Sequence, residues 1–455
     1  MMELDIAIIG GGPAGSSTAL ALLNQENYRI GILESSSQPV FRIGESVPPS
    51  IQSLLARLGV RIDLTKAGHL PALGNCSAWG DNTLGFNDFW TSVGGQGWHL
   101  DRAKFDRSLL QTAVDRGATV LRGVRVVGCD RASDGRWILN LNPQTGSTTQ
   151  ITASFVVDGS GPRSVFAHWQ GAYTVHMDSL LGLAGIFSLN GVEAVKPGYT
   201  LVEAVELGWW YAAHLPEDRV IVTLMSDRDI IQQHGLSRLD AWMAALQKTH
   251  HVRELVKGAT QPLKLEIQPA FSQYLDKISG DGWLAVGDAA FKVDPLSSAG
   301  IYKALRSGIN AADAIGQFRA GQEQALLSYH LQTQHQFELY LEDRRKYYSQ
   351  ETRWASSPFW KRRQGKIALS PKTSLYFQSS SQAMARLKQL DRHLPPNDLY
   401  RLCNLCNSSD DSPRCASEVV AEFLAQTTQK FSAYRPIEAL EYLIEQQVIQ
   451  TVFLQ

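Results

Sequence analysis

Short apolar runs alternate with stretches of helical apolar spacing over the first 320 residues. Runs of strand length lie at Leu4 to Ile9, Ile30 to Leu33 and Thr149 to Val157. Residues from Ala14 to Leu23 and from Ile301 to Phe318 instead carry their apolar positions at the period of a helix. Alternation of strand and helix predicts an α/β fold built on a parallel, Rossmann-like sheet.

A second, strand-rich pattern runs from Ser179 to Ser226, with a shorter strand predicted within Leu73 to Gly80. Adjacent side chains on a strand point to opposite faces, so Trp209, Trp210 and Tyr211 place large rings on both faces. This predicts a large sheet covered on both sides, with a candidate substrate cavity on one of them. The aromatic residues between Trp79 and Trp98 fit either a core or the wall of a pocket.

The remainder of the chain has apolar residues at helical spacing. Helices are expected over Leu236 to Leu255, Leu326 to Tyr348, Thr373 to Leu390, Ala416 to Phe431 and Pro436 to Val452. The segment Glu342 to Lys366 mixes Lys and Arg with aromatic residues. We interpret it as a solvated helix face with long basic side chains, the alternative being a docking site for an acidic partner.

The strand Leu4 to Ile9 leads directly into Gly10-x-Gly12-x-x-Gly15, and the second strand ends at Glu34. In a strand–turn–helix unit these glycines permit a tight turn, close approach of a pyrophosphate and close packing of helix on strand. The helix N-terminus offers free N–H groups to phosphates, and a terminal carboxylate accepts hydrogen bonds from a ribose. The pattern predicts a dinucleotide site.

Two later strands also end in acids and glycines, at Asp158-Gly159 and at Gly287-Asp288. Asp294-Pro-Leu-Ser-Ser-Ala-Gly300 follows the second of them and precedes a helix, whose N-terminus would again present N–H groups. The loop with Arg42, Glu45 and Ser46 either contacts the same cofactor or is a structural turn. These segments are expected to meet around one ligand.

Bulk properties exclude several classes of function. The formal net charge is −1, so no global field favours nucleic acid or an anionic membrane. No apolar run is long enough to span a membrane, and no signal peptide is evident. Five cysteines, an odd number, favour a reducing, cytoplasmic compartment. Cys403, Cys406 and Cys415 with His393 have irregular spacing, which favours buried thiols over a metal site.

Catalytic side chains are less evident than the cofactor site. No Ser-His-Asp, HExxH or Walker pattern is present, so a bound cofactor is expected to carry most of the chemistry. His99 and His214 are candidate acid–base residues because they fall in aromatic stretches. A structural role is the alternative for each histidine.

Taken together, these motifs resemble the p-hydroxybenzoate hydroxylase-type FAD monooxygenases over roughly residues 1–320. The resemblance implies one FAD, with the Asp101-Arg102-x-x-Phe105-Asp106 helix beside the flavin. The implied cofactor-binding residues are Gly10, Gly12, Pro13, Ala14, Gly15, Glu34, Ser35, Arg42, Glu45, Ser46, Arg102, Val126, Asp158, Asp288, Pro295, Ser298, Ala299, Gly300 and Ile301. The single nucleotide fingerprint implies no separate NAD(P) domain.

Gly44-Glu45-Ser46 and Asp294 to Gly300 also resemble the flavin-dependent halogenase branch of these proteins. Halogenases carry a lysine on the strand after this loop and its helix, but Ala72 to Gly80 contains none, and Lys66 precedes it. They also carry W-x-W-x-I-P, whose nearest match here is Tyr211-Ala-Ala-His-Leu-Pro216. The resemblance therefore implies a halogenase-like scaffold without the halogenase lysine, as in tryptophylquinone-biogenesis flavoproteins of the QhpG and LodB type.

The expected fold is an α/β, Rossmann-like FAD-binding domain, residues 1–175 and 260–320. It is interleaved with a substrate domain on a large mixed or antiparallel sheet, residues 176–259 with 70–100, and followed by a C-terminal helical region, residues 321–455. The expected function is hydroxylation of an electron-rich aromatic ring through a flavin C4a-hydroperoxide. The ring is that of a free substrate or of a Trp in a partner protein, and NAD(P)H or a flavin reductase supplies electrons. A halogenase, an FAD-dependent reductase and a non-enzymatic maturation scaffold are the alternatives.

Overall fold

The computed structural model describes residues 2–38, 43–90, 94–144, 146–189, 198–364, 369, 372–427, 431 and 434–452. Its first sheet has eight strands, with β1, β2, β8, β11 and β20 mutually parallel. Their bounds are β1 Met2–Ile9, β2 Ile30–Glu34, β8 Thr119–Arg122, β9 Val124–Arg131, β10 Trp137–Pro143, β11 Thr149–Asp158, β19 Ser279–Gly280 and β20 Trp283–Ala285. Strands of such a sheet are buried on both faces, which explains their nearly continuous apolar runs.

Three long helices pack around this sheet: α1 (Pro13–Leu23), α3 (Arg102–Asp115) and α8 (Gly300–Arg319). The shorter helices α2 (Ile51–Arg57) and α4 (Val165–Trp169) complete this part of the molecule. Helices α1 and α8 cross so closely that a Cβ on Gly308 would lie 2.0 Å from Ser17 Oγ. The segment around residue 300 is thereby held beside the first glycine loop, as the sequence predicted.

A second, seven-stranded sheet has the order β17-β13-β16-β15-β14-β5-β6 and is antiparallel except where β14 meets β5. The bounds are β5 Gly74–Ala78, β6 Gly85–Asp88, β13 Leu180–Ser188, β14 Tyr199–Val205, β15 Gly208–Leu215, β16 Arg219–Asp227 and β17 Glu266–Pro269. Trp210 points outward against Trp242 of α6 (Leu239–Leu246), whereas Trp209 and Tyr211 point inward. Both faces are covered, as predicted.

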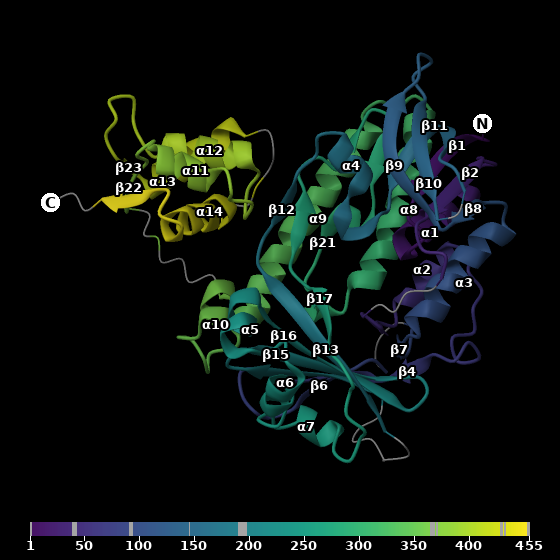
Figure 1. The fold of residues 1–455 in the computed structure, drawn as a ribbon, viewed down its shortest axis with the longest axis horizontal. Coiled ribbons are helices and arrows are strands. Elements are labelled where there is room, and N and C mark those ends of the chain that lie inside the picture. Colours follow the sequence, from purple (N-terminus) through teal and green to yellow (C-terminus); the bar gives the residue numbers. More distant parts are fainter. Residues whose placement is uncertain are drawn as a thin grey trace.

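Figure 1 shows the two sheets as separate layers, with α6 and α7 (Val252–Leu255) on the outer side of the second sheet. The sequence predicted one helix from Leu236 to Leu255, but the chain breaks between α6 and α7. The reason is Glu203 on β14, whose carboxylate accepts hydrogen bonds from the backbone N–H groups of His250, His251 and Val252. A distant carboxylate therefore caps a new helix start that local periodicity does not reveal.

Two small sheets and two helices join the layers. β7 (Gly97–His99) pairs with β3 (Ser46–Val47) and β4 (Leu70–Ala72), so that Ser46 lies opposite His99. β18 (Gln273–Leu275) pairs with β12 (Thr174–His176) and β21 (Phe291–Lys292). Helices α9 (Ala325–Ser349) and α10 (Pro358–Arg363) contribute Tyr348, Phe359 and Trp360 to the inner face of the second sheet, and the short α5 (Arg228–His234) follows β16.

The C-terminal part lies to one side of the two sheets in Figure 1. It contains α11 (Ser381–Leu387), α12 (Pro396–Leu405), α13 (Ala416–Gln426) and α14 (Tyr434–Glu445) around a small sheet of β22 (Ser374–Tyr376), β23 (Arg414–Cys415) and β24 (Gln450–Val452). Residues 373–390 and 436–452, predicted as helices, thus each contain a short strand. Within the described ranges no helix is long and apolar enough to cross a membrane.

Candidate active site

A cavity of about 630 Å³ lies between the carboxyl ends of the parallel strands and the inner face of the second sheet. Its lining includes residues that the sequence assigned to the cofactor: Gly10, Gly12, Pro13, Ala14, Glu34, Ser35, Ser46, Arg102, Val126, Asp288, Pro295, Ser298, Gly300 and Ile301. Segments separated by almost 300 residues therefore meet around one space, and its volume is within the range of small-molecule sites.

The first glycine loop forms one end of the cavity. Gly10 has φ +104°, and a Cβ there would lie 2.3 Å from the carbonyl oxygen of Gly159. A Cβ on Gly15 would lie 2.0 Å from Gly10 O, so both positions need glycine for steric reasons. Gly12 is the N-cap of α1 and no side chain caps this helix, which leaves N–H groups for an anion. This loop fits the diphosphate of FAD.

Glu34, at the end of β2, borders the same loop. Its Oε2 accepts a hydrogen bond from Gly11 N–H at 2.8 Å, and its Oε1 accepts one from Ser36 N–H at 2.8 Å. Each carboxylate oxygen keeps a further acceptor site, which suits a ribose hydroxyl. Glu34 therefore both orders the glycine loop and lines the space where the adenosine half of FAD would lie.

The other end of the cavity is formed by the loop before α8. Asp294 Oδ1 accepts a hydrogen bond from Leu296 N–H at 3.3 Å, and Ser298 adopts a left-handed conformation with φ +49°. Ala299 is the N-cap of α8 without a side-chain cap. A Cβ on Gly300 would have no atom within 4 Å, so this helix N-terminus opens onto free space that fits the flavin half of the cofactor.

Charged side chains border this flavin half. Lys303 Nζ lies 2.8 Å from Asp288 Oδ1. Burial alone would raise the pKa of the Asp288 carboxyl, but Lys303 and Lys292 lower it. Lys292 lines the cavity and donates a hydrogen bond to the carbonyl oxygen of Pro269. Burial lowers the pKa of the Lys292 ammonium, and Asp288 partly offsets this effect.

The second sheet supplies the wall that faces the flavin half, with Gly182, Tyr211 and Met225 among the lining residues. The Tyr211 hydroxyl lies 2.8 Å from Ser46 Oγ, which lies 2.9 Å from Thr200 Oγ1. His99 Nε2 lies 3.1 Å from the same Thr200 oxygen. We call Tyr211, Ser46, Thr200 and His99 the hydroxyl chain.

The remaining predicted residues lie outside the cavity lining. Asp158 is fully buried and accepts hydrogen bonds from Ser160 N–H, Ser160 Oγ and Ala167 N–H, so its carboxylate stabilises the turn after β11. Ala299 is the N-cap residue of α8, and Gly15 allows α1 to pack closely on the glycine loop. Glu45 lies beside Tyr211, behind the wall of the cavity. Arg42 lies outside the described residues.

The two histidines have different surroundings. His99 is fully buried, and burial and nearby His214 lower its pKa to about 3. It reaches the cavity only through the hydroxyl chain. His214 is three residues from Tyr211 on β15 and therefore points to the opposite, outer face of the sheet. Neither side chain lines the cavity.

Sequence reasoning missed Tyr211 and Lys292 as site residues. Tyr211 stands at the first position of the stretch compared with W-x-W-x-I-P, so its phenol could have been noticed as a polar group in place of an indole. Lys292 is a lone cation between the Gly287-Asp288 and Asp294-Pro295 motifs. A charge within an apolar run that borders a cofactor motif is the signal that would have identified it.

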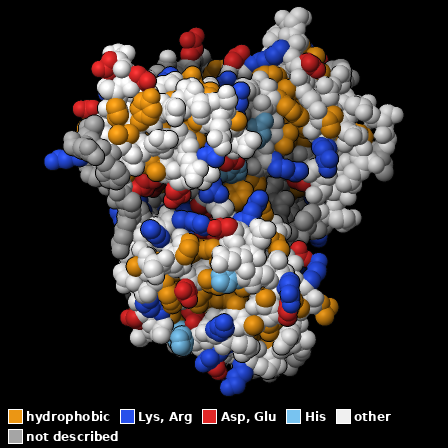
Figure 2. All heavy atoms as spheres, turned by 60° about the vertical axis from the view of Figure 1, so that its left-hand side comes forward, with side chains coloured by type: hydrophobic (Ala, Val, Ile, Leu, Met, Phe, Trp, Pro, Cys, Tyr) orange, Lys and Arg blue, Asp and Glu red, His pale blue; other side chains and the backbone are white. Residues whose placement is uncertain are grey.

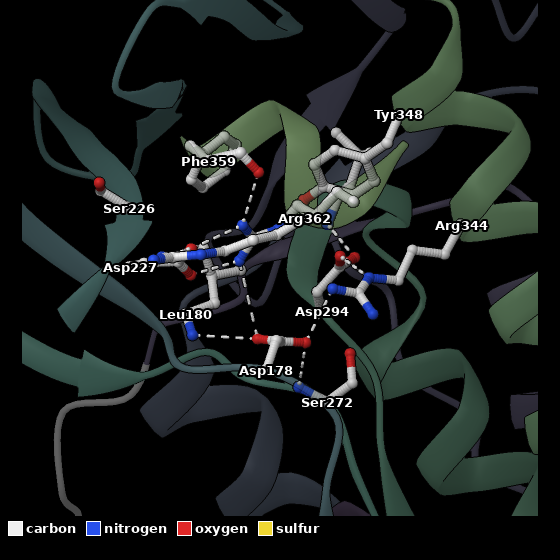
Figure 3. Close-up of polar contacts among 12 residues, drawn as sticks. Asp178, Leu180, Ser226, Asp227, Ser272, Asp294, Arg344, Tyr348, Phe359 and Arg362 are labelled. Carbon is white, nitrogen blue, oxygen red and sulfur yellow. Dashed lines mark hydrogen bonds and ion pairs between the residues drawn. The ribbon is translucent and has the colours of Figure 1, made fainter. Parts of the chain in front are cut away.

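A second, larger cleft of about 1170 Å³ lies between the second sheet and the C-terminal part. Figure 2 shows it as a hollow with Lys and Arg side chains around it. Its lining includes most members of a set of ion pairs that we call the arginine–aspartate network (Figure 3): Asp178, Asp227, Asp294, Arg344, Arg362 and Arg363. Asp294 lines the first cavity instead.

This network corrects the solvated-face interpretation of Glu342 to Lys366. Arg363 is buried and Arg344 is largely buried, both in ion pairs, and Tyr348, Phe359 and Trp360 are fully buried beside them. Their aspartate partners lie on other elements, which local periodicity cannot show. In the C-terminal part, Cys403 and Cys406 are buried thiols, and burial raises the pKa of Cys406 to about 12. The described residues contain no cluster of three His, Cys, Asp or Glu side chains suited to a metal.

Comparison with known proteins agrees with the cofactor site. The family model described as tryptophan halogenase matches residues 5–72 and 88–395. The putative FAD-dependent oxidoreductase LodB of Marinomonas mediterranea is 33% identical over 373 residues, which cover 81% of this chain and 99% of LodB. Tryptophan 2-halogenase of Chondromyces crocatus is 26% identical over 328 residues, which cover 70% of this chain and 62% of that protein.

Solved structures share the fold. The myxobacterial chondrochloren halogenase CndH has a TM-score of 0.72 at 20% identity, covering 98% of this chain and 97% of its own. The peptidyl tryptophan dihydroxylase QhpG has a TM-score of 0.61 at 24% identity, covering 80% and 79%. The family match narrows the resemblance from p-hydroxybenzoate hydroxylase-type proteins to the halogenase branch and confirms FAD as the cofactor. The chain belongs to the tryptophan halogenase family and is an FAD-dependent oxidoreductase.

Proposed function

We propose that the protein is an FAD-dependent monooxygenase that hydroxylates a tryptophan side chain of a partner protein during maturation of a tryptophylquinone cofactor. The observation that carries the proposal is the wall of the cavity. Strand β5, Gly74–Ala78, contains no lysine where halogenases carry one, and strand β15 of the same sheet instead presents the Tyr211 hydroxyl. The 33% identity with LodB along 99% of its length, and the fold shared with QhpG, support the same reading.

The wall suits a flat aromatic ring. Gly182 has no side chain, and a Cβ there would lie 3.1 Å from Met225 Sδ, so the glycine leaves space beside the thioether. Tyr211 adds an aromatic face, and ring–ring and sulfur–ring contacts both stabilise an indole. When bound, reduced FAD supplies the activation of dioxygen, while the buried sheet wall excludes water from the reacting atoms.

The test is a product assay under isotopically heavy dioxygen. The FAD-loaded protein is supplied with electrons from NADH, NADPH or a flavin reductase, and offered a synthetic peptide with one central tryptophan or free L-tryptophan. We expect mass spectrometry to find one heavy oxygen atom in the peptide indole, and little in the free amino acid. Incorporation of halogen instead of oxygen would contradict the proposal.

A second candidate function is halogenation with a lysine at a different position. Lys292 is the observation that favours it, because this amine lines the cavity and its pKa is lowered by burial. A lowered pKa makes the neutral, nucleophilic form of the amine easier to reach, and that form can carry an electrophilic halogen. Reactions in chloride and in bromide should then give products that differ by the halogen mass, and Lys292→Met should abolish them. Lys277→Met, outside the cavity lining, is the matched control.

A further inference from the structure

The hydroxyl chain contains three hydroxyl groups and one imidazole in an unbroken series of hydrogen bonds. The distances are 2.8 Å from Tyr211 to Ser46, 2.9 Å from Ser46 to Thr200 and 3.1 Å from Thr200 to His99 Nε2. A hydroxyl donates one hydrogen bond and accepts others, so each member can pass its proton along the series and take another. Tyr211 and Ser46 are the members that line the cavity.

A carboxyl group adjoins the cavity end of this chain. Glu45 is 2% exposed and lies beside the Tyr211 hydroxyl, and its Oε2 accepts a hydrogen bond from Gly44 N–H at 2.6 Å. In the described part of the chain, Glu45 Oε1 has no hydrogen-bond partner. Burial raises the pKa of the Glu45 carboxyl, so this group holds a proton at a higher pH than an ordinary glutamate.

We propose that Tyr211 is a catalytic residue that passes a proton between the Glu45 carboxyl and the reacting atoms in the cavity. Ser46, Thr200 and His99 are positioning residues that fix the direction in which the phenol donates. Glu45 is the proton store. The use of this path in ring hydroxylation rests on the proposed function, but proton delivery to dioxygen does not require an aromatic substrate.

The proton balance sets what this path must supply. Anionic reduced FAD gives two electrons and one proton, and with dioxygen and the ring C–H it forms C–OH and one water, a sum that takes up one further proton. Oxygen needs two protons from the path, one when dioxygen is reduced and one when water leaves, and the ring carbon releases one. Tyr211 gives each proton to oxygen and is reprotonated by Glu45, and it returns the ring proton to Glu45 by the reverse route. Glu45 therefore loses one proton in each cycle and regains it from solvent between turnovers.

The charged and titratable groups around Glu45 come from three elements. Arg102 on α3 favours the carboxylate, but Arg102 is itself paired with Asp106 at 3.2 Å. Tyr211 on β15 and His99 on β7 complete the set, and the pKa of His99 is lowered to about 3, so this imidazole is neutral. Among the described residues, Arg102 is thus the one cation beside Glu45. On this side of the cavity the Glu45 carboxyl is the group that carries the proton.

The experiment mixes the reduced, FAD-loaded protein with dioxygen in the absence of any aromatic compound. Dioxygen takes two electrons and one proton from anionic reduced FAD, and it needs one more proton to leave as hydrogen peroxide. Tyr211→Phe should slow the return of oxidised-flavin absorbance by about 100-fold, the usual scale of one acid–base group. Tyr199→Phe, on the same sheet with its hydroxyl 2.7 Å from Asp88, should leave the rate unchanged.

Thr200 distinguishes positioning from packing. Thr200→Val keeps the shape and removes the hydroxyl, and should slow the same step by about tenfold, whereas Thr200→Ser should restore it. In the unmodified protein the rate should fall as pH rises through the raised pKa of Glu45, because the carboxyl must hold a proton to act. The rate of flavin oxidation in Glu45→Gln should be low at every pH and should not fall as pH rises. The affinity for FAD should stay within about twofold in all variants.

Two results would overturn the proposal. The first is a Tyr211→Phe protein whose rate of flavin oxidation and pH profile equal those of the unmodified protein. The second is a Thr200→Val protein whose rate of flavin oxidation equals that of Thr200→Ser. The second result can be obtained even if the Tyr211 variant fails to fold. The product assay under heavy dioxygen judges the proposed function separately. Flavin kinetics that depend on Tyr211 without a hydroxylated product would refute the hydroxylase function and support the proton path.

Discussion

Two largely buried polar networks border the FAD cavity, and they satisfy their polar groups in different ways. The arginine–aspartate network is built from full charges that are nearly all paired. Arg363 Nη2 lies 2.6 Å from Asp227 Oδ1, and Arg344 lies 2.8 Å from Asp178 and 3.1 Å from Asp294. The hydroxyl chain, in contrast, is neutral, and His99 Nδ1 and Glu45 Oε1 have no partner within the described ranges.

The difference indicates what each network does. Paired charges in a buried site hold elements in one arrangement, and here they tie α9, α10 and β16 to the loop that begins at Asp294. Breaking one such pair leaves an uncompensated charge, so the network resists change. A neutral chain of hydroxyl groups can pass a proton from one member to the next, and its unpaired ends leave sites where a proton can bind. The first network therefore fixes the flavin loop, and we infer that the second takes part in its chemistry.

The largest expected effect comes from breaking the charged network. Asp227→Asn keeps the shape of the side chain but leaves Arg363 without its close carboxylate, because Asp178 lies 3.8 Å away. We expect the free energy of unfolding to fall by about 3–5 kcal/mol. Denaturant unfolding of the FAD-loaded protein measures this loss. The oxygen reaction of molecules that remain folded should change little, since Asp227 does not line the FAD cavity.

Asp229→Asn is the matched control for that measurement. Asp229 pairs with Arg362 at 2.7 Å, but its side chain is 58% exposed, and exposed pairs contribute about 0–1 kcal/mol. A similar loss in both variants would show that burial is not what makes the network strong. Burial opposes ionisation of Asp227, but Arg363 and Arg362 lower its pKa. The gap between Asp227→Asn and the unmodified protein should therefore be full above pH 3.8 and shrink as pH falls through the depressed pKa.

A smaller effect is expected at Lys292, where a charge reaches the cavity itself. A buried cation favours the extra negative charge of reduced flavin, so Lys292→Met should lower the midpoint potential of FAD. A change of about 30 mV corresponds to about 1.4 kcal/mol for a two-electron couple. Spectroelectrochemical titration of the bound flavin measures it. Lys277→Met should leave the potential unchanged, and an unchanged potential in Lys292→Met would mean that Asp288 already neutralises the amine.

The parts of the fold that local rules specify were predictable. The glycine loop, β1 and α1 follow from steric needs within a few residues, and the structure confirms the α/β architecture around them. Strands β22 and β24 were not predictable, because Ser374 pairs with Val452 across almost the whole C-terminal part and neither segment carries a strand period. Arg363 was expected in solvent because Asp227, which buries it, is 136 residues away in sequence.

The candidate site shows the same limit. Residues expected to bind a cofactor through backbone shape, such as Gly10 and Gly12, lie in a motif, so sequence placed them at the cavity that the structure shows. Tyr211 and Ser46 are 165 residues apart, so their hydrogen bond depends on the pairing of two sheets that no local pattern encodes. His99 and His214 were selected from their aromatic surroundings, but alternation along β15 turns His214 away from the wall that Tyr211 faces.

The dependence of stability on pH is the sharpest test of the comparison, because the two networks should respond to pH with opposite signs. Burial raises the pKa of Glu45 in the folded protein above its ordinary value of 4.5. As pH rises, the carboxyl therefore ionises in the unfolded chain before it ionises in the folded protein, and this favours unfolding. Stability of the unmodified protein is therefore lost as pH rises from 4.5 to the raised pKa, by about 1.4 kcal/mol for each pH unit between them. The glutamine of Glu45→Gln cannot ionise, so the melting temperature of this variant relative to the unmodified protein should rise across that window. Asp227→Asn should do the opposite. Its stability relative to the unmodified protein should fall as pH rises toward 3.8 and stay constant above pH 3.8. A Glu45→Gln protein with a flat difference would show that this carboxyl is already ionised in the folded state and cannot be the proton store.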